Sequence, residues 1–176
     1  MLFVTRFFKL NLNIFIIETM KEKIIELKME IYKTVELLDD DARLRSLAIE
    51  AAQHAYAPYS GFYVGTVVLF EGGAYVIGNN QENAAYPSGL CAERVALFSA
   101  GANLPDKIIR ALAIVAIKGD DIQKSVSPCG ACRQVMLETE QRNGKEIRIL
   151  LCGCDETVIV SSAKDLLPLY FSKMDL

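Results

Sequence analysis

The chain has 176 residues, of which 52% are hydrophobic and 23% charged, and its formal net charge is −3. This length and composition predict one soluble globular domain with a hydrophobic core. The acidic balance, without a stripe of lysine and arginine, argues against nucleic acid as the main partner. The odd number of cysteines and their Cys-x-x-Cys spacing favour metal binding in a reduced, cytoplasmic compartment over a disulfide framework; they are Cys91, Cys129, Cys132, Cys152 and Cys154.

The first part of the chain is predicted to be an N-terminal extension of uncertain structure, residues 1–38, ahead of a domain at residues 39–176. Residues 2–17 are rich in apolar side chains, but charged and amide residues interrupt them, so the run is too short to span a bilayer. No small-residue cleavage site follows. We therefore expect neither a signal peptide nor contact with a membrane, and Met20 is an alternative start of translation. Residues 20–38 fit either a helix or an extended lead-in.

The first half of the domain is predicted to hold a helix followed by a hairpin. Three aspartates at residues 39–41 are a helix start, and residues 42–56 repeat apolar side chains at helical spacing. Residues 63–70 and 74–78 are predicted strands, joined by a turn at Gly72-Gly73. The polar loop that follows is long for a connection, and such loops in compact domains are often functional.

The second half alternates helices and strands. We expect helices at residues 91–100, 129–141 and 162–167, and strands at residues 109–117, 146–151 and 157–160. The continuous apolar run at residues 109–117 is typical of a buried strand. The expected order is therefore α-β-β-α-β-α-β-β-α. It predicts an α/β fold with a single mixed five-stranded sheet sandwiched by helices.

Three cysteines are predicted to hold one zinc ion. Cys91 lies in Cys-Ala-Glu, and Cys129 and Cys132 lie in Pro-Cys-Gly-Ala-Cys. Each segment opens a predicted helix, whose N-terminus favours the thiolate that zinc needs. Three protein ligands leave the fourth tetrahedral position open, as in catalytic zinc sites. A Cys or His, a nearby Glu and Pro-Cys-x-x-Cys form the arrangement of zinc nucleobase deaminases.

Glu93 is the predicted catalytic residue, because it stands near the metal without binding it. Such a carboxylate can take a proton from a zinc-activated water and pass it to a ring nitrogen and a departing amine. Three thiolates would blunt the Lewis acidity of zinc, so Arg94 and Arg133 are predicted to hydrogen-bond the sulfurs and withdraw charge. A closed structural zinc site, with Cys152 or Cys154 as fourth ligand, is the alternative.

Four segments together resemble the cytidine deaminase family, in its small homotetrameric form whose zinc ligands are all cysteines. They are residues 56–62 (Tyr-Ala-Pro-Tyr-Ser-Gly-Phe), 80–87 (Asn-Gln-Glu-Asn-Ala-Ala-Tyr-Pro), 91–94 (Cys-Ala-Glu-Arg) and 127–134 (Ser-Pro-Cys-Gly-Ala-Cys-Arg-Gln). The likeness runs from about Arg43 to Phe171 and leaves out the extension. It implies one Zn²⁺ per subunit and a homotetramer with active sites at subunit interfaces.

The resemblance also implies how a nucleoside is bound. Phe62 would pack against the pyrimidine or its pocket wall, and Asn80 and Glu82 would hydrogen-bond the ribose 3′-hydroxyl. The backbone N–H of Ala92 would recognise the base carbonyl. Residues that would serve a neighbouring subunit's site are Ala84, Tyr86 and Phe171. Independently of the resemblance, the Glu82 carboxylate would repel a phosphate, which favours a nucleoside over a nucleotide.

The expected function is zinc-dependent hydrolytic deamination of cytidine and 2′-deoxycytidine to uridine and 2′-deoxyuridine, with release of ammonia, in pyrimidine salvage. Three alternatives stay open. The first is a deaminase of a related aminopyrimidine, such as blasticidin S or a deoxycytidylate. The second is an RNA- or DNA-editing deaminase, which would need a basic groove and stacking platforms. The third is a non-catalytic zinc module that acts in binding.

Overall fold

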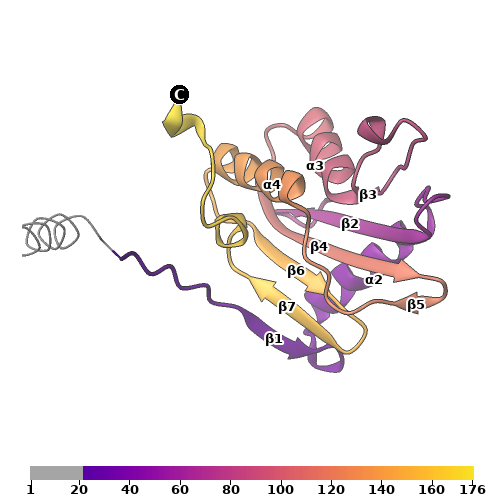
Figure 1. The fold of residues 1–176 in the computed structure, drawn as a ribbon. Helices are drawn as coiled ribbons and strands as arrows, with labels where there is room; N and C mark the ends of the chain where they lie inside the picture. Colours follow the sequence, from indigo (N-terminus) through magenta and orange to yellow (C-terminus); the bar gives the residue numbers. More distant parts are fainter. Residues whose placement is uncertain (1–21) are drawn as a thin grey trace, which may run out of the picture.

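The computed structural model describes residues 22–176 (Figure 1). The expectations for residues 2–17 and for a start at Met20 lie outside this range. A seven-stranded sheet forms the centre, with strand order β1-β7-β6-β4-β2-β3 and with β5 paired to β4. The β4–β6 pair is parallel and the other pairs are antiparallel, so the sheet is mixed, as predicted.

The elements have the following bounds. The strands are β1 (Glu30–Lys33), β2 (Phe62–Phe70), β3 (Tyr75–Asn79), β4 (Ile109–Lys118), β5 (Asp121–Ile122), β6 (Arg148–Cys152) and β7 (Glu156–Val160). The α-helices are α2 (Asp39–Gln53), α3 (Ala92–Asn103) and α4 (Gly130–Asn143). Short 3-10 turns are η1 (Thr34–Glu36), η2 (Tyr86–Ser88), η3 (Ala163–Leu166) and η4 (Lys173–Asp175).

The predicted five strands and the predicted element order are wrong at three places. Strand β1 precedes the first helix, β5 lies between β4 and α4, and the expected C-terminal helix is the single 3-10 turn η3. Strand β1 has the sequence Glu-Ile-Tyr-Lys, and all four residues are exposed. Because no face of this strand is buried, its apolar and polar side chains do not alternate, and the sequence gives no sign of it. Pairing of β1 with β7 also means that part of the predicted extension, residues 1–38, belongs to the sheet.

Helices cover both faces of the sheet, as predicted (Figure 1). Side chains alternate along β2, so Val68 and Phe70 pack with α3 and α4, whereas Val67 and Leu69 pack with α2. Each face thereby has its own hydrophobic cluster. Within the described residues, no helix has the length and apolar character needed to cross a membrane.

Two glycines allow helices to approach the sheet closely. A Cβ atom added at Gly78 of β3 would lie 2.7 Å from the carbonyl oxygen of Ala92 and 2.8 Å from Cβ of Ala96, both in α3. A Cβ atom added at Gly65 of β2 would lie 3.0 Å from Cα of Ala52 in α2, and closer still to the backbone nitrogen of Ala52 and the carbonyl oxygen of Ala48. The absence of a side chain at Gly78 therefore sets the depth at which the N-terminal half of α3 rests on the sheet.

Candidate active site

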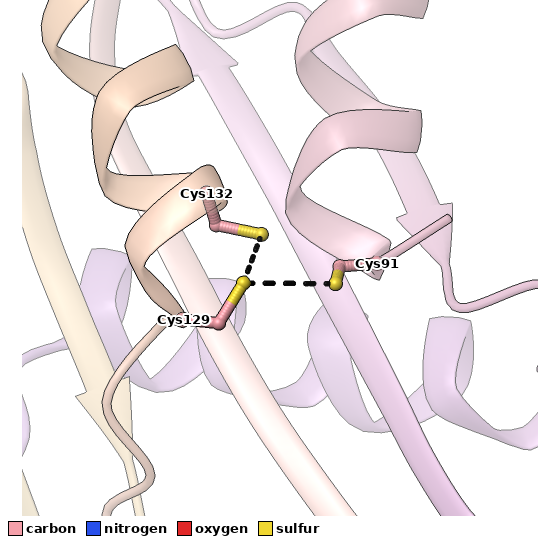
Figure 2. Close-up of side chains that lie close together, drawn as sticks. All are labelled: Cys91, Cys129 and Cys132. Carbon is pink, nitrogen blue, oxygen red and sulfur yellow. Dashed lines mark hydrogen bonds between the residues drawn. The ribbon is translucent and has the colours of Figure 1, made fainter. Parts of the chain in front are cut away.

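The three cysteines of the predicted zinc site lie together at the N-termini of two adjacent helices (Figure 2). Cys91 is the N-cap of α3, Cys129 is the N-cap of α4, and Cys132 is in the first turn of α4. The Sγ atom of Cys129 lies 3.9 Å from that of Cys91 and 3.5 Å from that of Cys132. All three sulfur atoms are within 4.8 Å of one another.

This spacing fits a zinc ion. Zinc bound tetrahedrally at about 2.3 Å from each sulfur requires sulfur atoms about 3.8 Å apart. The two sulfur–sulfur distances from Cys129, 3.9 and 3.5 Å, bracket that value. Among residues 22–176, this group contains three possible ligands and no fourth, which is the donor set of an open site.

The two remaining cysteines lie elsewhere. Cys152 is buried in the hydrophobic cluster on the α2 face of the sheet, opposite α3 and α4. Cys154 is exposed, and its thiol lies 3.4 Å from the carboxylate of Asp155. Neither joins the cluster of three thiols, which argues against a closed four-sulfur site.

Glu93 lies in the first turn of α3 and its side chain is 5% exposed. Burial is the main cause that raises the pKa of this carboxyl, and the charge of the neighbouring Cys91 adds to it. A buried carboxyl beside a metal-binding cluster is a group suited to general acid and base chemistry.

The two arginines that were predicted to hydrogen-bond the sulfurs differ in what they contact. Nη2 of Arg94 donates to Sγ of Cys91 at 3.7 Å. The Cys132 thiol and then Arg94 lower the pKa of Cys91, to about 5, whereas the contact with Cys91 and burial raise the pKa of Cys132. Arg133 instead donates to backbone carbonyls, from Nε to Pro128 at 2.8 Å and from Nη1 to Leu166 at 3.0 Å. Only Arg94 thus has a sulfur partner.

A pocket of about 530 Å³ opens beside the cysteine cluster, a size suited to a small molecule. Cys91 and Arg94 line one part, and side chains from the two polar motif segments line the rest. Three predicted substrate-binding residues line this pocket: Asn80, Glu82 and Tyr86. The other four are not among its lining residues: Phe62 is partly buried, Ala92 is buried, and Ala84 and Phe171 are exposed.

Asn80 and Glu82 hold the two motif segments together. The Asn80 side chain accepts from the Val64 N–H at 2.7 Å and donates to the Phe62 carbonyl at 2.9 Å. Glu82 accepts from the Tyr59 N–H at 2.9 Å, and also from the N–H and hydroxyl of Ser60. These hydrogen bonds, that of the Ser60 hydroxyl first, lower the pKa of Glu82. The loop is therefore anchored before any ligand binds.

Several lining residues were not predicted from the sequence. Tyr59 contacts Tyr86 edge to face, with ring centroids 6.2 Å apart and an interplanar angle of 71°. The further lining residues are Ser60, Gln81, Asn83, Gly89 and Leu90. Most of them belong to the motif segments 56–62 and 80–87, so membership of a motif was the signal that could have found them.

Comparisons with known proteins agree with this geometry. Residues 38–144 match the family described as the cytidine and deoxycytidylate deaminase zinc-binding region. The chain is 41% identical over 129 residues to a cytidine deaminase of Halalkalibacterium halodurans, covering 73% of this chain and 92% of that protein. It is 40% identical over 137 residues to a cytidine deaminase of Sporosarcina psychrophila, covering 78% and 95%.

The fold is also similar to that of solved structures. The crystal structure of a cytidine deaminase from Burkholderia pseudomallei superposes with a TM-score of 0.62 at 38% identity, covering 74% of this chain and 98% of that one. A cytidine deaminase structure from Mycobacterium tuberculosis gives a TM-score of 0.56 at 36% identity, covering 76% and 98%. The similarity in sequence and the similarity in fold each span about three quarters of the chain.

Proposed function

Because the chain belongs to the cytidine and deoxycytidylate deaminase family, we propose that it hydrolyses cytidine and 2′-deoxycytidine to uridine and 2′-deoxyuridine, with release of ammonia. One observation carries the proposal: three thiols lie within 4.8 Å of one another beside a small-molecule pocket, and Glu93 lies in the first turn of α3, the helix that Cys91 caps. Relatives of 41% and 40% identity bear the name cytidine deaminase, which supports the choice of substrate.

Cys91, Cys129 and Cys132 would hold one zinc ion per chain. When bound, zinc supplies a Lewis acid that lowers the pKa of a water molecule from about 15.7 toward about 7. The contact from Arg94 to Sγ of Cys91 withdraws charge from the thiolate. The set of three thiols leaves one coordination position, which a water molecule could take.

Glu93 would hold and move the protons of the reaction. Its carboxyl would take the protons of a water molecule whose oxygen forms the new bond to C4. It would pass one proton to ring N3 and one to the amine at C4, so that the C4–N bond breaks and the amine leaves as ammonia. The backbone N–H of Ala92 is the first of helix α3, where amide groups lack an intrahelical acceptor. This N–H would donate to the base carbonyl and so set the orientation of the ring over Glu93.

The sugar would lie against the anchored polar loop. Asn80 and Glu82 line the pocket, and each has oxygen lone pairs beyond its present hydrogen bonds that could accept from the 3′-hydroxyl. Phe62, at the start of β2, would pack against the pyrimidine. The ionised Glu82 would repel a 5′-phosphate, so a nucleoside is the better substrate.

A homotetramer with active sites at subunit interfaces would complete the pocket. Tyr86 is 77% exposed and Phe171 is 59% exposed, so both side chains are accessible to another copy of the chain. Together with Ala84, they would contact the site of a neighbouring copy. The proposed setting is pyrimidine salvage in the cytoplasm, where zinc-binding thiols stay reduced.

An ultraviolet assay of nucleoside turnover on purified protein, with a metal count on the same sample, tests this proposal. We expect one zinc per chain and conversion of both cytidine and 2′-deoxycytidine. Preference for a 5′-monophosphate or for blasticidin S would overturn the substrate. Salt-sensitive RNA binding with no nucleoside turnover would favour an editing enzyme. A zinc-loaded protein without turnover of any of these compounds would favour a binding module.

A further inference from the structure

Glu140, on helix α4, is a buried carboxylate with four hydrogen-bond donors around it. It is 8% exposed. Oε2 accepts from the backbone N–H of Ile147 at 2.8 Å and of Ala163 at 2.7 Å. Oε1 accepts from the hydroxyl of Ser162 at 2.6 Å and from the N–H of Lys164 at 3.4 Å. A buried charge is tolerated when donors satisfy it in this way.

Three of these four donors belong to the C-terminal tail, which we define as residues 161–176. Two more side chains of α4 bind the same tail. Arg133 donates from Nη1 to the carbonyl of Leu166 at 3.0 Å, and Gln134 donates from Nε2 to the carbonyl of Phe171 at 2.8 Å. The tail is thus fastened to α4 at both ends of the helix, and Figure 1 shows it passing beside α4.

Helix α4 is also the helix of the cysteine cluster. Cys129 is its N-cap and Cys132 lies in its first turn. Arg133, the next residue, also donates from Nε to the carbonyl of Pro128. The same rigid element therefore sets the positions of two candidate zinc ligands and of the tail that carries Phe171.

Phe171 itself is 59% exposed and is absent from the lining of the pocket in its own chain. Its backbone is nevertheless held, through the bond from Gln134. An exposed aromatic side chain on an anchored backbone is available for contact with another copy of the chain.

We propose that Glu140 is a positioning residue, which anchors the tail so that Phe171 reaches the active site of a neighbouring copy. This inference rests on the proposed function, because it assigns Phe171 to a nucleoside site. Glu140 acts at a distance from the reacting atoms, through Ser162, Ala163 and Lys164. Its effect therefore falls on substrate binding by the assembled enzyme, whereas proton transfer by Glu93 is left unchanged.

The test compares Glu140→Gln with Glu50→Gln in the full-length protein. Glutamine keeps the shape of Glu140 but turns an amide NH₂ toward backbone N–H donors, which breaks part of the anchor. Glu50 is an exposed glutamate on α2, so its substitution makes the same change of charge away from the tail. We expect Glu140→Gln to raise KM for cytidine about tenfold, as for the loss of one aromatic contact. Zinc content and kcat should not change.

Two further measurements separate positioning from general stability. Hydrogen exchange should accelerate in peptides of residues 162–171 and stay unchanged in those of α3. A double variant with Phe171→Ala should have the KM of Phe171→Ala alone, because both changes remove one contact. The proposal would be overturned if the double variant raised KM by the product of the two single effects. It would also be overturned if Glu140→Gln accelerated hydrogen exchange throughout the sheet and left KM unchanged.

The proposal can still be tested if Glu140→Gln does not fold or if the wild-type protein is inactive on cytidine. If Glu140→Gln does not fold, Ser162→Ala removes the hydroxyl that donates to Glu140 and that also caps η3 by accepting from the Lys164 N–H. It should show the same signature on KM and tail exchange, more weakly. Unchanged KM and tail exchange in that variant would overturn the proposal. If the wild-type enzyme turns over no cytidine, the proposed function fails. The hydrogen-exchange comparison of Glu140→Gln with Glu50→Gln would then still decide whether Glu140 anchors the tail.

Discussion

Substitution of Gly78 by alanine should damage the cysteine cluster by displacing the N-terminal half of α3. The new Cβ atom would lie 2.7 Å from the carbonyl oxygen of Ala92 and even closer to the backbone nitrogen of Ala96. Both atoms are helix backbone, so no flexible side chain can move aside. Relief to an ordinary contact of 3.4 Å requires α3 to move by 3.4 − 2.7 = 0.7 Å at Ala92.

The expected magnitude follows from two opposing effects. Overpacking costs about 1–3 kcal/mol, and a backbone clash belongs at the upper end. Replacement of glycine in a strand by alanine returns about 0.5–1 kcal/mol of conformational entropy. The free energy of unfolding should therefore fall by about 2 kcal/mol, which lowers the thermal midpoint by roughly 4–8 °C in a domain of this size.

The displacement matters more for the metal than for stability. Ala92 adjoins Cys91, and metal–ligand distances tolerate only about 0.2 Å of deviation. Gly78→Ala should therefore lose zinc to a chelator much faster than wild type, at a temperature where both proteins are folded. Gly65→Ala is the control, because it clashes even more closely with the backbone of α2, which carries no candidate ligand.

Thermal unfolding followed by circular dichroism and zinc release followed by a colorimetric chelator are the two assays. The reasoning is refuted if Gly78→Ala releases zinc at the wild-type rate. It is equally refuted if Gly65→Ala releases zinc as fast as Gly78→Ala does, since loss of metal would then follow stability alone.

Three other predictions concern the site and the sheet edge. Glu93→Gln should reduce turnover by about 10²- to 10⁴-fold while metal analysis finds the zinc content unchanged; a parallel loss of zinc would contradict a purely proton-moving role. Arg94→Gln should lower kcat more than it lowers zinc retention, and wild-type turnover would count against its contact with Cys91. Deletion of residues 1–33 removes β1 and exposes the edge of β7, so light scattering should show aggregation that the full chain lacks; equal scattering would rule out a protective role for β1.

The elements that bury a periodic apolar face could be predicted from the sequence. Helix α2 starts at Asp39, within the predicted aspartate run, and β2 and β3 form an antiparallel hairpin around the predicted turn at Gly72-Gly73. Strand β4 coincides closely with the apolar run at residues 109–117. In each case the signal is local, because it depends on spacing within one segment.

Strands β1 and β5 could not be predicted, because they depend on pairing partners far along the chain. Thr34, next to β1, donates its N–H to the carbonyl of Asp155 at 2.7 Å, and nothing near residue 34 indicates this partner. Strand β5 has two residues and exists only as an addition to β4. Neither strand contributes a buried apolar face that would leave a pattern in the sequence.

The difference between local patterns and contacts far along the chain also holds at the candidate active site. The cysteine cluster follows from local motifs at two helix N-termini, which the fold then brings together. The partners of Glu82 lie 22 and 23 residues earlier in the chain, and the buried environment of Glu140 depends on a tail 22 to 24 residues later. An acidic residue in a loop or on a helix is normally solvated, so tertiary contacts alone give these two carboxylates their roles.

Zinc K-edge X-ray absorption on the purified, zinc-loaded protein tests the central claim most directly, because it counts the atoms around the metal. The account predicts three sulfur neighbours at about 2.3 Å and one oxygen neighbour, which is the vertex open to water. Four sulfur neighbours, or a shell without sulfur, would contradict it, since water could not then be activated beside Glu93 by these three cysteines.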